Sequence, residues 1–113
     1  MEKDLEERTK RFALAVIQLM TGLPRSMVCD VIGRQLLRSA TSIGANYREA
    51  NRGVSRADFA NKIGTVQKEA AETQYWLELL VEAKIGDSRR VVAVLSESSE
   101  LLAIFISIGK KLK

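Results

Sequence analysis

The chain contains no histidine, one cysteine, one proline and few aromatic residues, and these scarcities exclude several kinds of chemistry. Without histidine, neither a Ser-His nor a Cys-His nucleophile can be built, and a zinc site would have one thiolate and no imidazole. The Glu-x-x-His motif of di-iron bundles is also excluded, although Glu69 and Glu72 have the spacing of its first half. The sequence therefore predicts a protein that is not an enzyme and has no metal or cofactor.

The scarcity of proline and of strand patterns favours helices. Pro24 is the only proline, so long uninterrupted helices are permitted almost everywhere. Strict alternation of apolar and polar residues is absent, which predicts an all-α fold. Cys29 is the only cysteine, which excludes an internal disulfide and fits a reducing compartment; its simplest interpretation is a small buried apolar side chain.

Targeting and membrane-spanning patterns are also lacking. The first ten residues, MEKDLEERTK, mix acidic with basic residues around no apolar core, unlike a secretory signal or a basic transit peptide. The longest apolar run, LLAIFISI at 101–108, is far shorter than the roughly 20 residues that a bilayer requires. We therefore expect a cytoplasmic protein with no membrane partner.

A length of 113 residues predicts a single domain over residues 1–113. Gly22 is suited to a left-handed helix cap before Pro24, and Ser26 and Ser55 are suited to N-caps. The predicted helices cover residues 3–21, 26–52, 56–85 and 88–112. Because the connections are short, consecutive helices should be antiparallel, which predicts an up-down-up-down four-helix bundle.

The segment QLLRSATSIGANYREANRG, residues 35–53, has more polar and small residues than a plain amphipathic helix needs. Helical periodicity places short polar side chains beside its core face, and a polar flank follows the third helix. If the two flanks face each other, they form an interhelical hydrogen-bond network that fixes register; a ligand or catalytic pocket is the alternative. The network residues are Ser39, Ser42, Asn46, Glu49, Lys62, Glu69 and Trp76.

Small residues also lie on faces outside the predicted core. Gly33 and Gly44 lie together on a flank of the second helix, where they would let another helix approach closely. The third helix has a second face that a lone bundle has little reason to expose. We interpret these second faces as subunit contacts, made on the third helix by Ala60, Gly64, Ala71, Tyr75 and Leu79.

An arginine stripe runs opposite the core of the second helix, formed by Arg34, Arg38, Arg48 and Arg52. Arginine forks suit phosphate oxygens, and several copies in an oligomer would multiply a weak patch into a strong field. The same side chains could instead be solvated or pair with acidic residues of a neighbouring subunit, such as Glu69, Glu78 or Glu82. Both interpretations remain open because the net charge is only +4.

Three segments, QLLRSATSIGANYREA, SRADFANKI and KEAAETQYWLELL, closely resemble the bacterial four-helix bundle proteins related to those encoded by intervening sequences in 23S rRNA genes. The resemblance covers about residues 12–85. It implies a homopentameric barrel around a central channel. A relative, the accessory variability determinant of diversity-generating retroelements, binds a reverse transcriptase and nucleic acid. The signature positions that match are Arg38, Ser39, Ser42, Asn46, Glu49, Phe59, Lys62, Glu69 and Trp76.

Three hypotheses of function follow. The first is a non-enzymatic oligomeric module that binds RNA, DNA or a nucleic-acid enzyme such as a reverse transcriptase. The second is a purely structural or protein-interaction bundle without nucleic-acid binding. The third is an enzyme that uses Glu49 or Glu69 as a general base, which is disfavoured because the sequence supplies no obvious nucleophile or metal centre.

Overall fold

The computed structural model describes the backbone of residues 2–113 and the side chains from Asp4 onward; Met1 of the expected domain lies outside the described residues. It confirms the all-α prediction, since the described part contains four helices and no strand. The helices are α1 (Glu2–Thr21), α2 (Met27–Ala50), α3 (Arg56–Glu82) and α4 (Ser88–Lys111).

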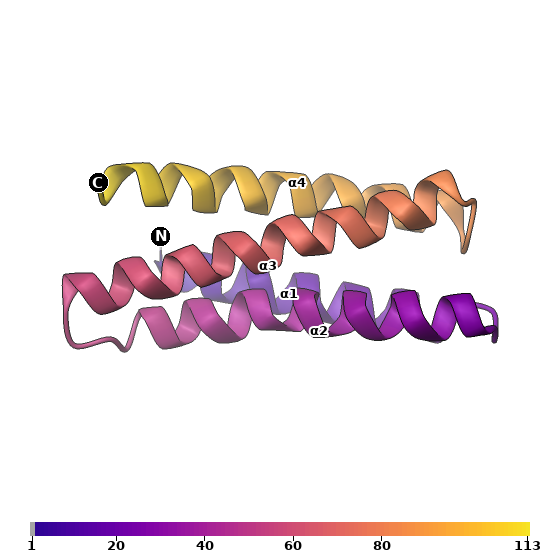
Figure 1. The fold of residues 1–113 in the computed structure, drawn as a ribbon, viewed down its shortest axis with the longest axis horizontal. Helices are drawn as coiled ribbons and strands as arrows, with labels where there is room; N and C mark the ends of the chain where they lie inside the picture. Colours follow the sequence, from indigo (N-terminus) through magenta and orange to yellow (C-terminus); the bar gives the residue numbers. More distant parts are fainter. Residues whose placement is uncertain (1) are drawn as a thin grey trace.

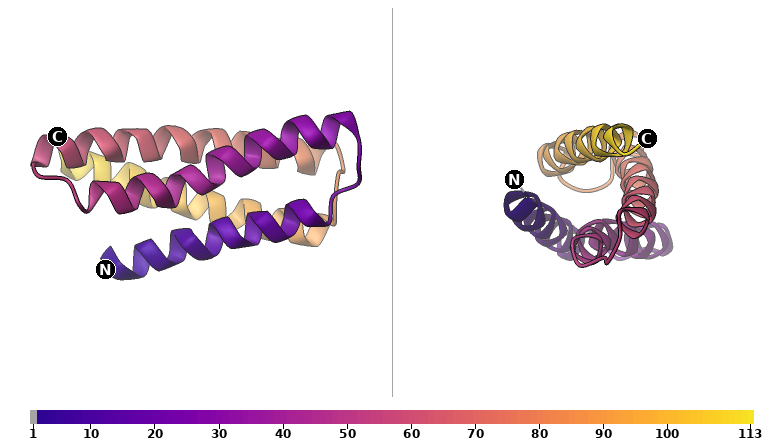
Figure 2. Two further views of the ribbon diagram at one scale, coloured as in Figure 1. Left: turned by 90° about the horizontal axis from the view of Figure 1, so that it is seen from below. Right: turned by 90° about the vertical axis from the view of Figure 1, so that its left-hand side faces the viewer.

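The helices run alternately up and down and form an elongated bundle of 44 × 20 × 18 Å (Figure 1). In the described part, each helix packs against its neighbours in the chain, and α1 also packs against α4. The α2–α3 interface is the most extensive and the α1–α4 interface the least, as the end-on view in Figure 2 illustrates. A cavity of about 520 Å³ lies between α1 and α4, with Leu5 and Ile104 among its walls.

The predicted N-caps are confirmed. Ser26 and Ser55 have extended backbones, and their hydroxyls accept hydrogen bonds from the amides of Cys29 and Asp58 at 3.0 and 3.1 Å. Each hydroxyl thereby satisfies an amide that has no carbonyl partner within its helix. Asp87 caps α4 in the same way.

One predicted cap conformation and two predicted helix ends differ from the structure. Gly22 does not have the left-handed conformation that we expected; its amide donates to the Leu19 carbonyl in a tight turn instead. Helix α2 ends at Ala50 rather than at 52, since the amides of Arg52 and Gly53 bond three residues back. Helix α3 ends at Glu82 rather than at 85, where the chain enters a left-handed turn. In α2 and α3 the last turn tightens and satisfies free carbonyls earlier than periodicity indicates, whereas α1 ends at Thr21 as predicted.

The core extends along the whole bundle and contains apolar side chains from all four helices. The polar Thr9 is also fully buried, and Cys29 is buried as predicted. The buried apolar residues are Phe12, Val16, Leu19, Cys29, Leu36, Ala40, Ile43, Tyr47, Ala50, Ile63, Val66, Ala70, Leu77, Leu80, Val91, Leu101 and Phe105.

The glycine flank of α2 is covered by α1 of the same chain. A Cβ atom at Gly44 would lie 3.1 Å from the Thr9 hydroxyl, and one at Gly33 would lie 3.2 Å from the Met20 sulfur. These glycines therefore allow α1 to approach α2 closely. The prediction that this flank is a subunit contact is wrong, because helical periodicity identifies a packed face but not the helix that covers it.

Helix α4 is long and apolar enough, by length and composition alone, to cross a membrane, and 22% of the apolar window is buried within the bundle. The short run at 101–108 did not reveal this, because Ser and Glu residues interrupt a longer apolar segment. Two of them, Glu97 and Glu100, form ion pairs with Arg8 of α1. These pairs and the packing on α3 join α4 to the bundle.

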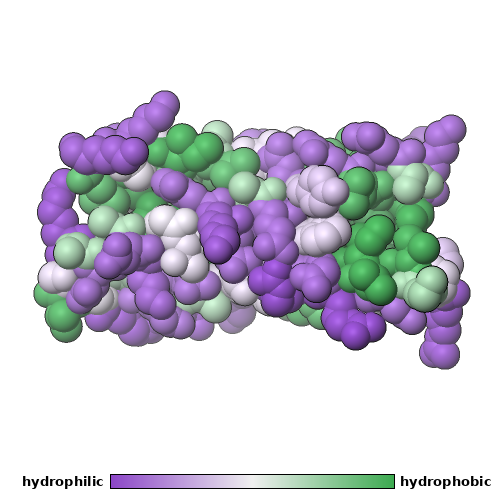
Figure 3. Space-filling view, in the orientation of Figure 1, coloured by the Kyte–Doolittle hydropathy of each residue, from purple (hydrophilic) through white to green (hydrophobic). Residues whose placement is uncertain are grey.

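Apolar side chains also lie on the outer surface. Figure 3 shows apolar patches towards both ends of the face seen in Figure 1, while hydrophilic residues cover its middle. The exposed apolar residues of α2 and α3 are Met27, Val28, Val31 and Tyr75, and those of α1 and α4 are Leu14, Ile17, Val92 and Ile106.

Candidate functional site

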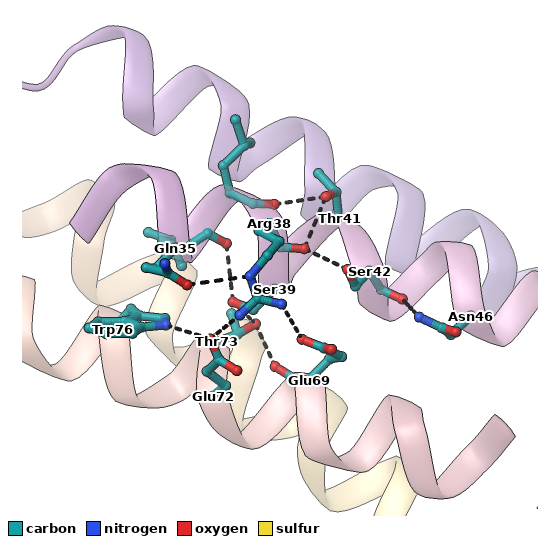
Figure 4. Close-up of polar contacts among 12 residues, drawn as sticks. Gln35, Arg38, Ser39, Thr41, Ser42, Asn46, Glu69, Glu72, Thr73 and Trp76 are labelled. Carbon is teal, nitrogen blue, oxygen red and sulfur yellow. Dashed lines mark hydrogen bonds and ion pairs between the residues drawn. The ribbon is translucent and has the colours of Figure 1, made fainter. Parts of the chain in front are cut away.

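A polar seam fills the middle of the α2–α3 interface (Figure 4). Helix α2 supplies Gln35, Arg38 and Ser39, one turn apart, and α3 supplies Glu69, Glu72, Thr73 and Trp76 with the same spacing. Residues three and four apart lie on one helix face, so both sets point into the interface. We call these seven residues the α2–α3 seam.

Arg38 is the centre of the seam. Its guanidinium lies 3.2 Å from a Glu69 carboxylate oxygen and donates a further hydrogen bond to Glu72. Its Nε donates to the Gln35 side-chain oxygen at 3.3 Å. The hydrogen bond to Glu72 is the main reason that the pKa of Arg38 is raised. One arginine thus joins two carboxylates of α3 to α2.

Glu72 is held in its ionised form. Trp76 Nε1 donates to a Glu72 carboxylate oxygen at 3.1 Å, and this bond, followed by the hydrogen bond from Arg38, lowers the pKa of Glu72. A carboxylate with a lowered pKa is a weak base, and here it is already paired. The seam is therefore suited to fixing two helices rather than to abstracting a proton.

Two hydroxyl groups lie beneath the charged layer. Thr73 Oγ1 lies 2.9 Å from Ser39 Oγ and 2.7 Å from the Glu69 carbonyl, and both side chains are completely buried. Ser39 Oγ also lies 3.2 Å from the Leu36 carbonyl. Buried hydroxyls stabilise a fold only when they are paired, so this contact fixes the register of α3 against α2.

The other residues of the expected network lie elsewhere. Glu49 and Lys62 form a separate α2–α3 ion pair at 2.9 Å, close to the α2–α3 turn. Ser42 and Asn46 donate to backbone carbonyls of α2 itself, at 2.6 and 2.8 Å. Short polar side chains in a helix can bond to a carbonyl one turn earlier in the same helix. For these two, our interhelical prediction is wrong.

The four arginines of the stripe do not share the same partners. Arg38 belongs to the seam, and Arg48 Nε lies 3.6 Å from a carboxylate oxygen of Glu6 on α1. Arg34 and Arg52 are exposed, and no ion pair involves them within the described residues. These two members of the stripe therefore have no carboxylate partner, although the Arg52 guanidinium donates to the Arg48 carbonyl at 3.3 Å.

Sequence reasoning missed a second charged group, at the α1–α4 interface. Arg8 binds Glu97 through two parallel hydrogen bonds of 2.7 and 2.8 Å, and it reaches Glu100 at 2.9 Å. The bond to Glu97 is the largest cause of the raised pKa of Arg8. The sequence contained a signal for this charged group, because Glu97 and Glu100 share one face of an otherwise apolar helix.

The expected subunit contacts lie on the outer face of α3. Gly64, Ala71 and Tyr75 are exposed, and a Cβ atom at Gly64 would meet nothing within 4 Å. Ala60 and Leu79 are half-buried at the edges of this face. The Tyr75 ring makes an edge-to-face contact with Trp76, at a centroid separation of 5.1 Å, which connects the outer face to the seam.

The fold and the seam together define a class of protein: an antiparallel four-helix bundle whose polar residues join helices. Between residues 4 and 113, no three Cys, Asp or Glu side chains gather to hold a metal ion.

Comparison with known proteins makes the identification more specific. The chain belongs to the 23S rRNA-intervening sequence protein family, whose pattern it matches over residues 2–107. It is also similar to a crystal structure of a protein of unknown function from the S23 ribosomal protein family of Bacteroides thetaiotaomicron VPI-5482. The two share 40% sequence identity over 94% of this chain and 98% of the other, with a TM-score of 0.85. No curated protein sequence matches the chain.

Proposed function

We propose that this protein is a non-enzymatic, cytoplasmic, oligomeric module that associates with RNA or DNA, and through it with a nucleic-acid enzyme such as a reverse transcriptase. The observation that carries the proposal is the presence of exposed arginines, Arg34 and Arg52, that form no ion pair in the described residues. A guanidinium without a carboxylate partner can bind phosphate without breaking an ion pair. The family's relation to 23S rRNA genes supports the same partner.

Oligomerisation is part of the proposal. The two stripe arginines without an ion pair make a weak site in one chain, but a homopentamer, the assembly that the family resemblance favours, would present five copies. The outer face of α3, with Gly64, Ala71 and Tyr75 exposed, is the subunit contact we propose.

The test is the salt dependence of binding to a labelled RNA oligonucleotide. We expect affinity to fall steeply as salt rises, because phosphate contacts release counterions. Substitution of Arg34→Ala with Arg52→Ala should reduce that slope. Arg38→Ala is the matched control: its guanidinium is engaged by Glu69 and Glu72, so it should loosen the α2–α3 interface and leave the slope unchanged. No binding at low salt, or a flat salt dependence, contradicts the proposal.

A second candidate function is favoured by the exposed apolar side chains. Met27, Val28 and Val31 lie together at the start of α2 and are at least half exposed. Exposed apolar groups of this kind are common at protein contacts. A structural or protein-interaction bundle would form the same oligomer and bind no nucleic acid at any salt concentration.

A further inference from the structure

One end of the bundle carries a cluster of unpaired cations. This end contains the α2–α3 turn and the C-terminal turn of α4, on the left in Figure 1. We call this cluster the basic end; its members are Arg52, Arg56, Lys110, Lys111 and Lys113. All five side chains are exposed, and within the described residues none lies within ion-pair distance of a carboxylate.

The antiparallel topology brings these residues together from distant parts of the sequence. Helix α2 ends, α3 begins and α4 ends at this side of the bundle. The Arg56 guanidinium donates a hydrogen bond to the Lys111 carbonyl at 3.5 Å, which joins the first turn of α3 to the last turn of α4. The cluster is therefore built on three rigid helix ends rather than on a flexible tail.

The charge balance at this end is positive. The nearby carboxylates of Glu6 and Glu49 already face Arg48 and Lys62. Asp4 and Asp58 remain, and Asp58 occupies the first turn of α3, where a negative charge complements the helix dipole. Among the side chains that the structure describes, from Asp4 onward, five cations thus exceed the available carboxylates, whereas at the seam Arg38 is shared by two carboxylates.

Lysines in the last turn of a helix also complement its dipole, so Lys110 and Lys111 could serve only to stabilise α4. That role depends on proximity to the last carbonyls, and its effect is small for exposed residues. Lys113 follows the end of α4. Arg52 follows the end of α2 and donates to the Arg48 carbonyl in its last turn at 3.3 Å, which fits the dipole of α2. Arg56 lies in the first turn of α3, where a cation opposes the dipole of that helix. Dipole compensation therefore does not account for the whole cluster.

We infer that the basic end, rather than the whole arginine stripe, is the surface that contacts the phosphate backbone in the nucleic-acid association proposed above, on which this inference rests. Arg34 lies about 27 Å along the helix axis from Arg52, so it is not part of the basic end, and the inference assigns no phosphate contact to it. Lysine ammonium groups and arginine forks bind phosphate oxygens irrespective of base identity. Binding should therefore be independent of sequence.

The test compares two triple variants with the same change in net charge. Lys110→Gln, Lys111→Gln and Lys113→Gln remove charge from the basic end, whereas Lys10→Gln, Lys68→Gln and Lys84→Gln remove it from exposed, unpaired sites elsewhere. Fluorescence anisotropy of a labelled 30-nucleotide RNA measures affinity across a series of salt concentrations. For the first variant, the salt slope should fall by about 2, since each lost phosphate contact lowers it by about 0.7 to 0.9. The second variant should retain the wild-type slope.

Arg34→Gln and Arg52→Gln, made separately, give an independent check. The inference predicts that only Arg52→Gln lowers the salt slope, by about 0.7 to 0.9. RNAs of different sequence should bind with the same affinity. Circular dichroism establishes that every variant remains helical, which is expected because all of the substituted side chains are exposed.

The outcomes separate the inference from the proposed function. If the wild-type protein binds no RNA at low salt, the proposed function fails. If it binds RNA but the two triple variants have equal slopes, or only Arg34→Gln lowers the slope, nucleic-acid binding stands and the basic end is not its site. Binding to vesicles that contain phosphatidylserine, without binding to RNA, would assign the basic end to anionic lipid and overturn the inference.

Discussion

Lys84 has a backbone conformation that a side chain disfavours. Its φ is 58°, in the left-handed region, and it follows the end of α3. The amides of Lys84 and Ile85 donate to the carbonyls of Val81 and Leu80, at 3.1 and 2.9 Å. This is the Schellman arrangement, which glycine usually completes because it has no Cβ to clash. Here a lysine has this conformation, which is unfavourable in free energy for a residue with a Cβ atom.

We therefore predict that Lys84→Gly stabilises the protein. Relief of the left-handed strain should exceed the extra entropy of glycine in the unfolded chain, for a net gain of about 0.5 to 1 kcal/mol. Urea unfolding measures the change. Lys68→Gly is the matched control: it makes the same substitution at an exposed site within α3 and should cost about 0.5 to 1 kcal/mol. A loss of stability in Lys84→Gly would show that the lysine side chain has a stabilising contact.

At the scale of the helices, the α2–α3 seam should make stability depend on pH. The pKa of Glu72 is lowered from its ordinary value of 4.5, first by the hydrogen bond from Trp76 and then by Arg38. Folding therefore favours the ionised carboxylate. Its contribution is fully present above about pH 4.5 and is lost as pH falls through the lower pKa of the folded state.

Glu72→Gln tests this dependence, because glutamine keeps a hydrogen-bond acceptor for Trp76 but has no charge to titrate. The variant should be less stable than the wild type at pH 7, and the difference should shrink at pH 3. Urea unfolding followed by the fluorescence of Trp76, the single tryptophan, measures both. Glu82→Gln, on the exposed end of α3, should differ little from the wild type at either pH. A Glu72→Gln deficit that does not change between pH 7 and pH 3 would contradict the assigned electrostatic role.

The helices themselves could be predicted from the sequence to within a few residues, because caps and apolar spacing are local signals. The helix that packs against each flank could not be predicted from the sequence. Gly44 marks a close approach, but α1 and a second subunit would require the same small residue. Arg38 lies opposite the core in projection, yet its long side chain reaches round to Glu69 and Glu72 on α3. Side-chain reach and helix order are tertiary properties that one helix does not encode.

At the scale of the whole molecule, the outer face of α3 has small residues that no other part of the described chain covers. Gly64 and Ala71 are exposed and small, and Tyr75 is 53% exposed beside them. Small residues allow close approach of a second helix, and a large aromatic group supplies apolar area once that helix excludes water. A second copy of the chain would therefore gain most by packing against α3.

Tyr75→Glu should weaken the assembly if this face joins subunits, because the burial of an unpaired carboxylate is strongly unfavourable. We expect wild-type protein to scatter light as a multiple of 12.6 kDa, with the pentamer favoured by resemblance. The variant should dissociate at a concentration at least about tenfold higher. Val54→Glu adds the same charge to the α2–α3 turn, at a side chain that is 94% exposed, and should leave the mass unchanged. A wild-type mass of 12.6 kDa at high concentration would contradict an α3 contact, and dissociation of the Val54→Glu variant alone would assign the subunit contact to the turn.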